Sequence, residues 1–130
     1  MRTVIKERYH LLGVEEVANA ITHGLGFVLS LIGFVFLVWL AAKNPSGWQV
    51  ASCFIYGTSL VALYLASTLY HTAVSEKAKL RLQLVDHCCI YILIAGSYTP
   101  FAMIPLRDGI GPYLFTFAWA FAAVGISMKL

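Results

Sequence analysis

Long apolar runs dominate this sequence. Four stretches carry almost no Asp, Glu, Lys or Arg, namely residues 17–42, 44–75, 82–106 and 109–128. Each reaches the roughly 20 residues that a helix needs to cross a bilayer. None alternates apolar and polar positions as a transmembrane strand does, and backbone groups in lipid must be bonded internally. The pattern predicts an all-α integral membrane bundle with four transmembrane helices.

The predicted boundaries divide the chain into an arm, residues 1–16, and a transmembrane bundle, residues 17–130, with spans at about 17–42, 48–74, 82–104 and 110–128. The arm mixes apolar and basic residues, which fits a cytoplasmic segment on the headgroup surface or a disordered tail. Glu15 and Glu16 are expected in the first turn of the first helix, where carboxylates complement the helix dipole. No signal-peptide core precedes the first span, which is expected to direct its own insertion.

Small residues at helical spacing mark the predicted packing faces. In the first span, Gly26 and Ser30 form a small-x-x-x-small pair of the kind that lets helices approach closely in lipid. The fourth span repeats the pattern with Ala118, Ala122 and Gly125. Pro100 is expected to kink or end the third span, since proline lacks the backbone N–H.

Composition and charge refine this picture. Hydrophobic residues make up 60% of the chain and charged residues 12%, which is outside the globular range. The basic residues lie beside helix ends, where they can meet anionic lipid headgroups, and nothing favours nucleic acid as a partner. Lys43 and Arg107 fall on one side of the bundle. The larger group on the other side is Arg2, Lys6, Arg8, Lys77, Lys79, Arg81 and Lys129. The positive-inside rule then predicts a plasma-membrane (bacterial inner-membrane) protein with both termini cytoplasmic.

Three polar side chains near the cytoplasmic ends of the second and third spans form the candidate site. Ser67 and His71 are four residues apart on one helix face, and Asp86 lies one turn into the next span. Ionisable groups inside membrane spans are rare and face the protein interior, so their default interpretation is functional. The depth of the first span places a possible supporting shell at the same level, made of Asn19, Thr22 and His23.

This set contains the parts of a metal hydrolase. A histidine can ligate zinc, a carboxylate can deprotonate a metal-bound water, and a hydroxyl can donate to a developing oxyanion. A purely structural interpretation is open as well: Ser67 bonds its own helix, His71 reaches the headgroups, and Asp86 pairs with Lys79 or Arg81. For His23, the structural interpretation is that it packs between helices with its hydrogen-bonding groups paired.

The remaining histidines and the cysteines are weaker candidates. His87 lies about 100° around the helix from Asp86, and His10 lies in the arm. Cys53, Cys88 and Cys89 lack a C-x-x-C spacing and are expected as free thiols.

Three further motifs follow one another in order along the chain. The first runs from Glu15-Glu16 to Asn19-Ala20-x-Thr22-His23-Gly24. The second is Ser67-Thr-Leu-Tyr-His71, and the third runs from Asp86-His through Gly96 to Thr99-Pro100. From about residue 9 onward, the chain with these motifs resembles the bacterial hemolysin III family, a branch of the superfamily of progestin and adipoQ receptors that includes the adiponectin receptors.

The resemblance implies a seven-helix protein with zinc near its cytoplasmic side, of which this chain matches the first four helices. It assigns zinc to the histidine matching His71 and to two histidines of a His-x-x-x-His motif on the last helix. Asp86 then lies against the metal-bound water, and Ser67 lines the site. This chain contains no His-x-x-x-His, so zinc is expected to bind weakly to these 130 residues alone.

The sequence therefore leads to a functional hypothesis with two alternatives. The hypothesis is a zinc-dependent, ceramidase-like hydrolase of lipid amides or esters, with Asp86 and Ser67 catalytic and His71 the metal ligand. The first alternative is a pore-forming protein, with homo-oligomers that lyse a target membrane. The second is a receptor-like or structural bundle.

Overall fold

The computed structural model describes residues 2–43 and 46–130, with side chains described from residue 13 onward. It contains four helices: α1 (Arg2–Ala42), α2 (Gly47–Thr72), α3 (Glu76–Met103) and α4 (Gly111–Ser127). The all-α prediction is confirmed, since the described residues form helices, turns and short connections. Three helices, α1 from Gly13, α2 and α3, are long and apolar enough to cross a membrane. The apolar α4 has 17 residues, so its assignment as a fourth span stays a prediction.

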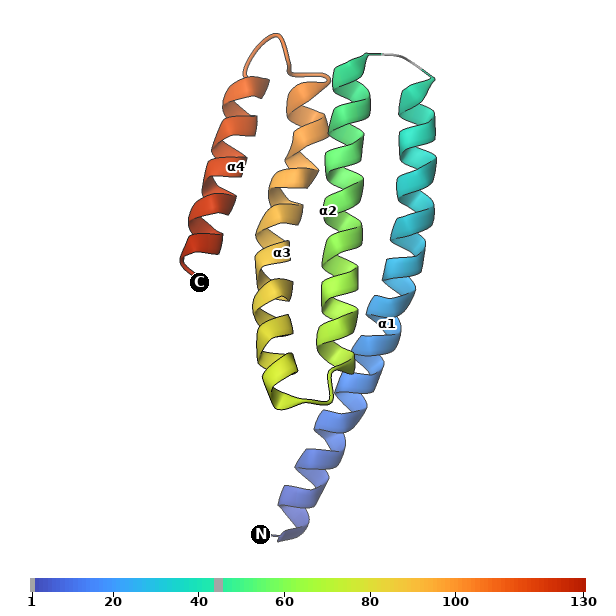
Figure 1. Cartoon of the computed structure of the whole chain (residues 1–130), viewed down its shortest axis with the longest axis vertical. Helices are drawn as coiled ribbons and strands as arrows, with labels where there is room; N and C mark the ends of the chain where they lie inside the picture. The colour runs from blue at the N-terminus through green and yellow to red at the C-terminus, as the bar shows by residue number, and fades with distance from the viewer. Residues whose placement is uncertain (1, 44–45) are drawn as a thin grey trace.

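The helices form a single antiparallel layer in the order α1, α2, α3, α4 (Figure 1). In the described part of the chain, each helix packs mainly against its neighbour in sequence. Serine caps define where two helices begin: Ser46 Oγ accepts from the Gln49 N–H at 3.2 Å, and Ser75 Oγ accepts from the Ala78 N–H at 3.4 Å. A layer one helix thick leaves its two broad faces open.

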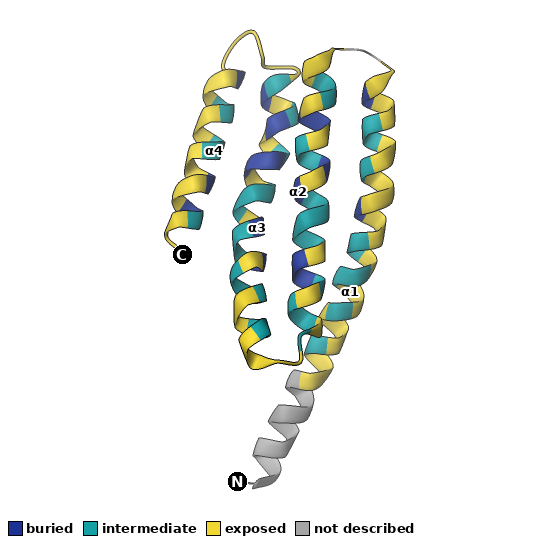
Figure 2. Cartoon of the chain, in the orientation of Figure 1, coloured by how far each residue is buried: buried dark blue, intermediate teal, exposed yellow. Residues whose placement is uncertain are grey.

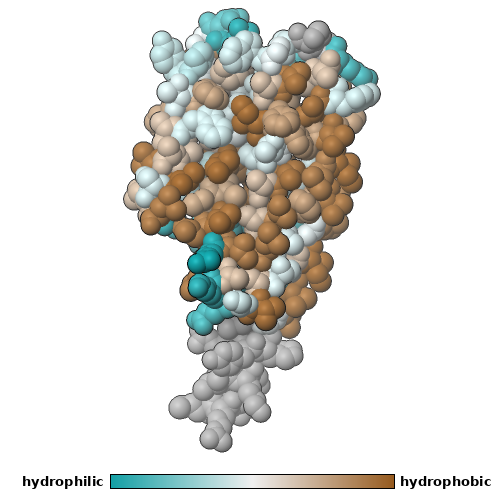
Figure 3. Space-filling model, in the orientation of Figure 1, coloured by the Kyte–Doolittle hydropathy of each residue, from teal (hydrophilic) through white to brown (hydrophobic). Residues whose placement is uncertain are grey.

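Burial follows the pattern of a protein in lipid (Figure 2). The buried apolar residues are alanines and cysteines, and the buried polar ones are Ser30, Ser52, Ser59, Ser67, Asp86 and Thr99. Large side chains point outward, with Val35 69% and Phe117 70% exposed. Figure 3 shows apolar side chains over the middle of the molecule and hydrophilic ones toward its ends. In lipid, no hydrophobic effect drives large apolar side chains into the protein interior. Their outward position therefore identifies a membrane protein.

Glycines bring the helices into contact, as the small-residue pattern predicted. A Cβ on Gly26 would lie 2.5 Å from the ring of Tyr64, so α1 and α2 can approach only because that Cβ is absent. Gly125 of α4 faces the ring of Tyr91 of α3 in the same way. Ser30 is buried, as expected for a packing position.

Two helix starts differ from the prediction: α1 begins at Arg2 rather than near residue 17, and α3 begins at Glu76 rather than near residue 82. Asp86 therefore lies almost three turns into α3, and the expectation that it lies one turn into the helix was wrong. Because α1 begins at Arg2, Glu15 and Glu16 lie within the helix rather than in its first turn, and that expectation was wrong. The physical reason is that residues 2–12 contain no proline or glycine to stop the helix. The side chains of the predicted arm before Gly13 lie outside the described residues.

At the other end of the bundle, α3 continues through Pro100 to Met103. The proline lies in the last turn of the helix, and its carbonyl accepts from the Ile104 N–H at 3.0 Å. The preceding hydroxyl, that of Thr99, donates to the Ala95 carbonyl at 2.9 Å.

Candidate functional site: a polar cavity at one end of the bundle

A hydrogen bond between α1 and α2 forms the centre of the site. His23 Nδ1 and Ser67 Oγ lie 2.5 Å apart. The antiparallel register of the two helices brings them together, and Gly24 faces Thr68 beside them. Ser67 is 4% exposed, so the bond lies in the interior of the helix layer. The two side chains are 44 positions apart in sequence.

Asp86 of α3 lies on the same cavity. The cavity has a volume of about 260 Å³ and is lined by His23, Leu63, Tyr64, Ser67, Asp86 and Ile90. Three helices therefore each contribute one chemically active side chain. Asp86 is only 9% exposed, which makes it a buried carboxyl group beside a hydroxyl and an imidazole. A polar recess of this kind within apolar helices is the expected form of a functional site.

His71 belongs to an adjoining cluster rather than to the lining of the cavity. Its Nδ1 donates to Glu16 Oε2 at 3.1 Å, and Lys79 Nζ lies 2.8 Å from the same oxygen. The His71 ring meets the His23 ring edge-on, with centroids 5.3 Å apart. Glu16 thus links α1, α2 and α3 beside the cavity. Because Glu16 and Lys79 are each 34% exposed, the ion pair between them adds little stability.

Glu16 is the residue of this cluster that sequence reasoning missed. It lies seven positions before His23, which places both side chains on one face of α1 two turns apart. That spacing was the available signal, but the helix-dipole interpretation of Glu16 hid it.

The other predicted residues lie outside the cavity lining. Asn19 and Thr22 are exposed, and the Thr22 hydroxyl donates to the Ala18 carbonyl of its own helix at 2.9 Å. His87 is half-buried and does not line the cavity. Lys79 contacts Glu16, so it does not serve Asp86 in the way the structural interpretation supposed. Cys53, Cys88 and Cys89 are free thiols.

The donor set falls short of a zinc site. With its Nδ1 bonded to Glu16, His71 retains Nε2 as one ligand nitrogen, in the arrangement that orients metal-binding histidines. Among residues 13–43 and 46–130, however, no three His, Cys, Asp or Glu side chains are grouped to hold a metal ion. Zinc ordinarily takes three or four protein ligands. The described residues therefore do not fit zinc on their own.

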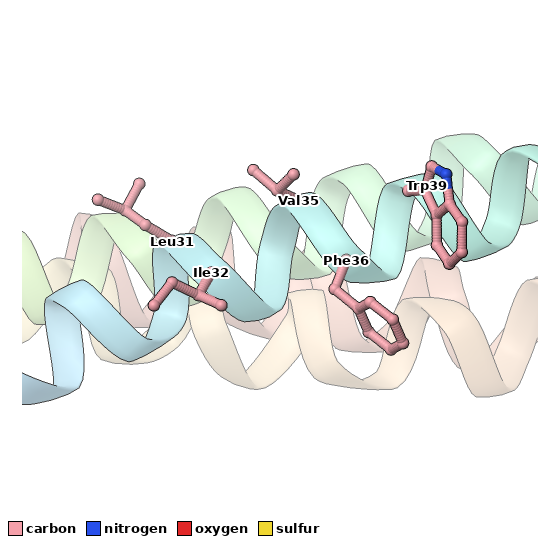
Figure 4. Close-up of a pocket in the computed structure, with 5 residues that line it drawn as sticks. All are labelled: Leu31, Ile32, Val35, Phe36 and Trp39. Atoms are coloured by element: carbon pink, nitrogen blue, oxygen red, sulfur yellow. The ribbon is translucent and has the colours of Figure 1, made fainter.

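A separate apolar recess is remote from this chemistry. It lies on the outer face of α1 and is lined by Leu31, Ile32, Val35, Phe36 and Trp39 (Figure 4). All of these side chains come from one helix and carry almost no polar surface. This recess is a gap between outward-facing side chains that lipid tails can fill.

Aromatic and basic residues mark the end of the bundle opposite the polar cavity. Lys43 Nζ lies 3.6 Å from the ring centroid of Trp39, and the Arg107 guanidinium lies 4.9 Å from that of Trp48. Such pairs are typical of the membrane–water interface, where tryptophan rings and snorkelling cations sit at headgroup level.

The helix layer has apolar outer faces, an interior of small residues and a polar cavity at one end. These features define a helical membrane protein with an embedded polar site. The family model described as "Haemolysin-III related" matches residues 13–130. The chain therefore belongs to the hemolysin III family, as its motifs indicated.

The relatives agree with this assignment. The chain is 47% identical over 116 residues to the "Hemolysin-3 homolog" of Bacillus subtilis (strain 168), covering 89% of this chain and 54% of that protein. It is 42% identical over 116 residues to "Hemolysin-3" of Bacillus cereus, covering 89% and 53%. It is 31% identical over 125 residues to the human "Monocyte to macrophage differentiation factor", covering 91% and 50%, which supports the superfamily placement. The chain spans about half the length of these relatives, and no solved structure matches it significantly.

Proposed function

We propose that this chain forms part of a membrane-embedded hydrolase that cleaves an amide or ester bond of a lipid. One observation carries the proposal: a buried carboxyl group, a hydroxyl and an imidazole from three helices line one cavity of about 260 Å³. Carboxylates and hydroxyls placed together in a water-poor recess are suited to acyl-group hydrolysis. The open apolar faces of the helix layer give a lipid a lateral route to that recess.

In the proposed reaction, Asp86 and Ser67 take part directly. Asp86 accepts a proton from the attacking water as the new C–O bond forms, and then passes that proton to the departing amine or alcohol as the amide C–N or ester C–O bond breaks. Ser67 donates its hydroxyl hydrogen to the oxygen of the lipid carbonyl as negative charge develops on it. The apolar lining, Leu63 and Ile90, excludes bulk water and strengthens both interactions.

Zinc is proposed only for an assembly in which further ligands join His71. The described residues do not provide three, so no step of the proposed reaction depends on the metal. Metal analysis of the purified 130-residue chain is expected to give well under one zinc per chain, with no change in His71→Ala. One tightly bound zinc per chain that is lost in His71→Ala would contradict this expectation.

A pore is the second candidate, because the Bacillus cereus relative is called "Hemolysin-3". A pore needs polar groups along a whole span, whereas the cavity described above lies at one end of the layer. The two functions are separated by reconstituting the protein in liposomes that hold a trapped dye and a fluorescent lipid amide or ester. Hydrolysis without dye release supports the hydrolase. Dye release without hydrolysis supports a pore, which homo-oligomers of the protein would form.

We also propose that the protein lies in the bacterial plasma membrane with its amino terminus in the cytoplasm. The distribution of basic residues supports this orientation. In a background without the native cysteines, a membrane-impermeant maleimide added to intact cells is expected to label Lys43→Cys. Lys77→Cys is expected to react only after the cells are permeabilised, and the reverse pattern would contradict the orientation.

A further inference from the structure

Ser67 differs from the other helical hydroxyls in the partner it binds. Elsewhere in the described helices, the serine and threonine hydroxyls that form hydrogen bonds donate to a carbonyl three or four positions earlier in their own helix. On α2 itself, Ser59 donates to the Tyr56 carbonyl at 2.7 Å and Thr68 to the Tyr64 carbonyl at 2.6 Å. Ser67 instead bonds across to His23 of α1. Its oxygen is therefore held away from the position that a helical serine ordinarily adopts.

The imidazole that holds Ser67 is itself packed from two sides. The ring of Tyr64 meets it edge-on with centroids 6.1 Å apart, and the ring of His71 does so at 5.3 Å. Tyr64 can occupy that place because Gly26 offers no Cβ to block it. The orientation of the His23 ring is thus set by packing before any substrate arrives.

We infer that His23 is a positioning residue that sets the direction of the Ser67 hydroxyl, an inference that rests on the proposed hydrolase. With its hydrogen on Nδ1, the His23 ring donates to Ser67 Oγ, and the hydroxyl hydrogen is then free to point into the cavity toward a lipid carbonyl. Without the imidazole, rotation about χ1 would let the hydroxyl bond the Leu63 carbonyl four positions earlier in the helix. The donor would then be lost from the cavity although Ser67 remained.

Two replacements of His23 separate this role from simple packing. In His23→Asn, the side-chain amide overlays Nδ1 and can still donate to Ser67. In His23→Gln, the amide overlays Nε2 and cannot. We expect His23→Asn to retain most of kcat and His23→Gln to lose about 10²-fold with KM little changed, the size of effect seen when a reacting group is misplaced. Equal losses in both variants, with equal thermal stability, would overturn the inference.

A second measurement does not depend on activity. In ¹⁵N-histidine-labelled protein in liposomes, solid-state NMR is expected to show the His23 ring with its hydrogen on Nδ1, with His23→Asn providing the assignment. Ser67→Ala is expected to shift that Nδ1 resonance and leave the His87 resonances in place. A His23 ring protonated only on Nε2, or one insensitive to Ser67→Ala, would overturn the inference.

The two measurements distinguish a failure of the proposed function from a failure of the role assigned to His23. If the NMR pattern is as expected but the protein hydrolyses no lipid amide or ester, the proposed function fails and the hydrogen-bonded pair stands. If hydrolysis occurs and the NMR response is absent, the role assigned to His23 fails and the proposed function stands.

Discussion

Replacement of Asp86 by Asn is expected to lower the rate of lipid hydrolysis by about 10²–10⁴-fold, the usual contribution of a general base. Asp86 is the acidic group that lines the cavity with Ser67 and His23, and it is 9% exposed. Asparagine has nearly the same shape but cannot accept the proton of the attacking water. Initial rates on a fluorescent lipid amide or ester in liposomes measure the effect.

Glu76→Gln is the matched control for this experiment. Glu76 lies on the same helix, in its exposed first turn, and the change removes the same charge. The control is expected to retain the wild-type rate, and both variants are expected to keep the wild-type helix content by circular dichroism. A rate for Asp86→Asn within twofold of wild type would remove Asp86 from the reaction.

Replacement of Gly111 by Ala is expected to destabilise the bundle by about 1–3 kcal/mol, the typical cost of overpacking. Gly111 begins α4, and an added Cβ would collide with the backbone carbonyl oxygens of Ala102 and Leu106. Backbone atoms cannot move aside as the end of a side chain can. The start of α4 would have to shift away from α3, which weakens the hydrogen bond from the Gly111 N–H to the Leu106 carbonyl, now 2.8 Å.

Gly109→Ala serves as the comparison, because its Cβ would meet the nearest atom, the Leu106 carbonyl oxygen, at an ordinary 3.9 Å. That variant is expected to unfold within about 0.5 kcal/mol of wild type, as most surface substitutions do. Unfolding of both variants in mixed micelles, followed by circular dichroism, measures the difference. Equal stability of the two variants would show that α4 is not fixed to α3 at this point.

Much of the fold was predictable because the insertion of a segment into a membrane depends on the summed hydropathy of its residues. The four apolar runs predicted four helices, although α1 and α3 begin well ahead of their predicted starts, and serines 46 and 75 cap the beginnings of α2 and α3. The small-residue pair of the first span correctly placed Gly26 at a helix contact. The start of α1 was missed because polar residues ahead of an apolar run can continue a helix as readily as they can end it.

The sequence predicted which residues belong to the candidate site better than it predicted their hydrogen-bond partners. Depth counting placed six polar residues at one level: Asn19, Thr22, His23, Ser67, His71 and Asp86. The structure brings three of them, His23, Ser67 and Asp86, to one cavity. No spacing or motif predicted the hydrogen bonds of Ser67 to His23 and of His71 to Glu16. Those choices depend on how each helix is rotated about its axis, and a small rotation exchanges one partner for another.

Hydropathy and local motifs belong to individual residues and short segments, so they were sufficient to identify a helical membrane protein of the hemolysin III family. The contacts between polar groups depend instead on how the helices pack. Glycines such as Gly26 set the distance between helices, and the antiparallel register sets which turns face one another. Contacts between residues 44 and 55 positions apart follow from that packing, which no local pattern encodes.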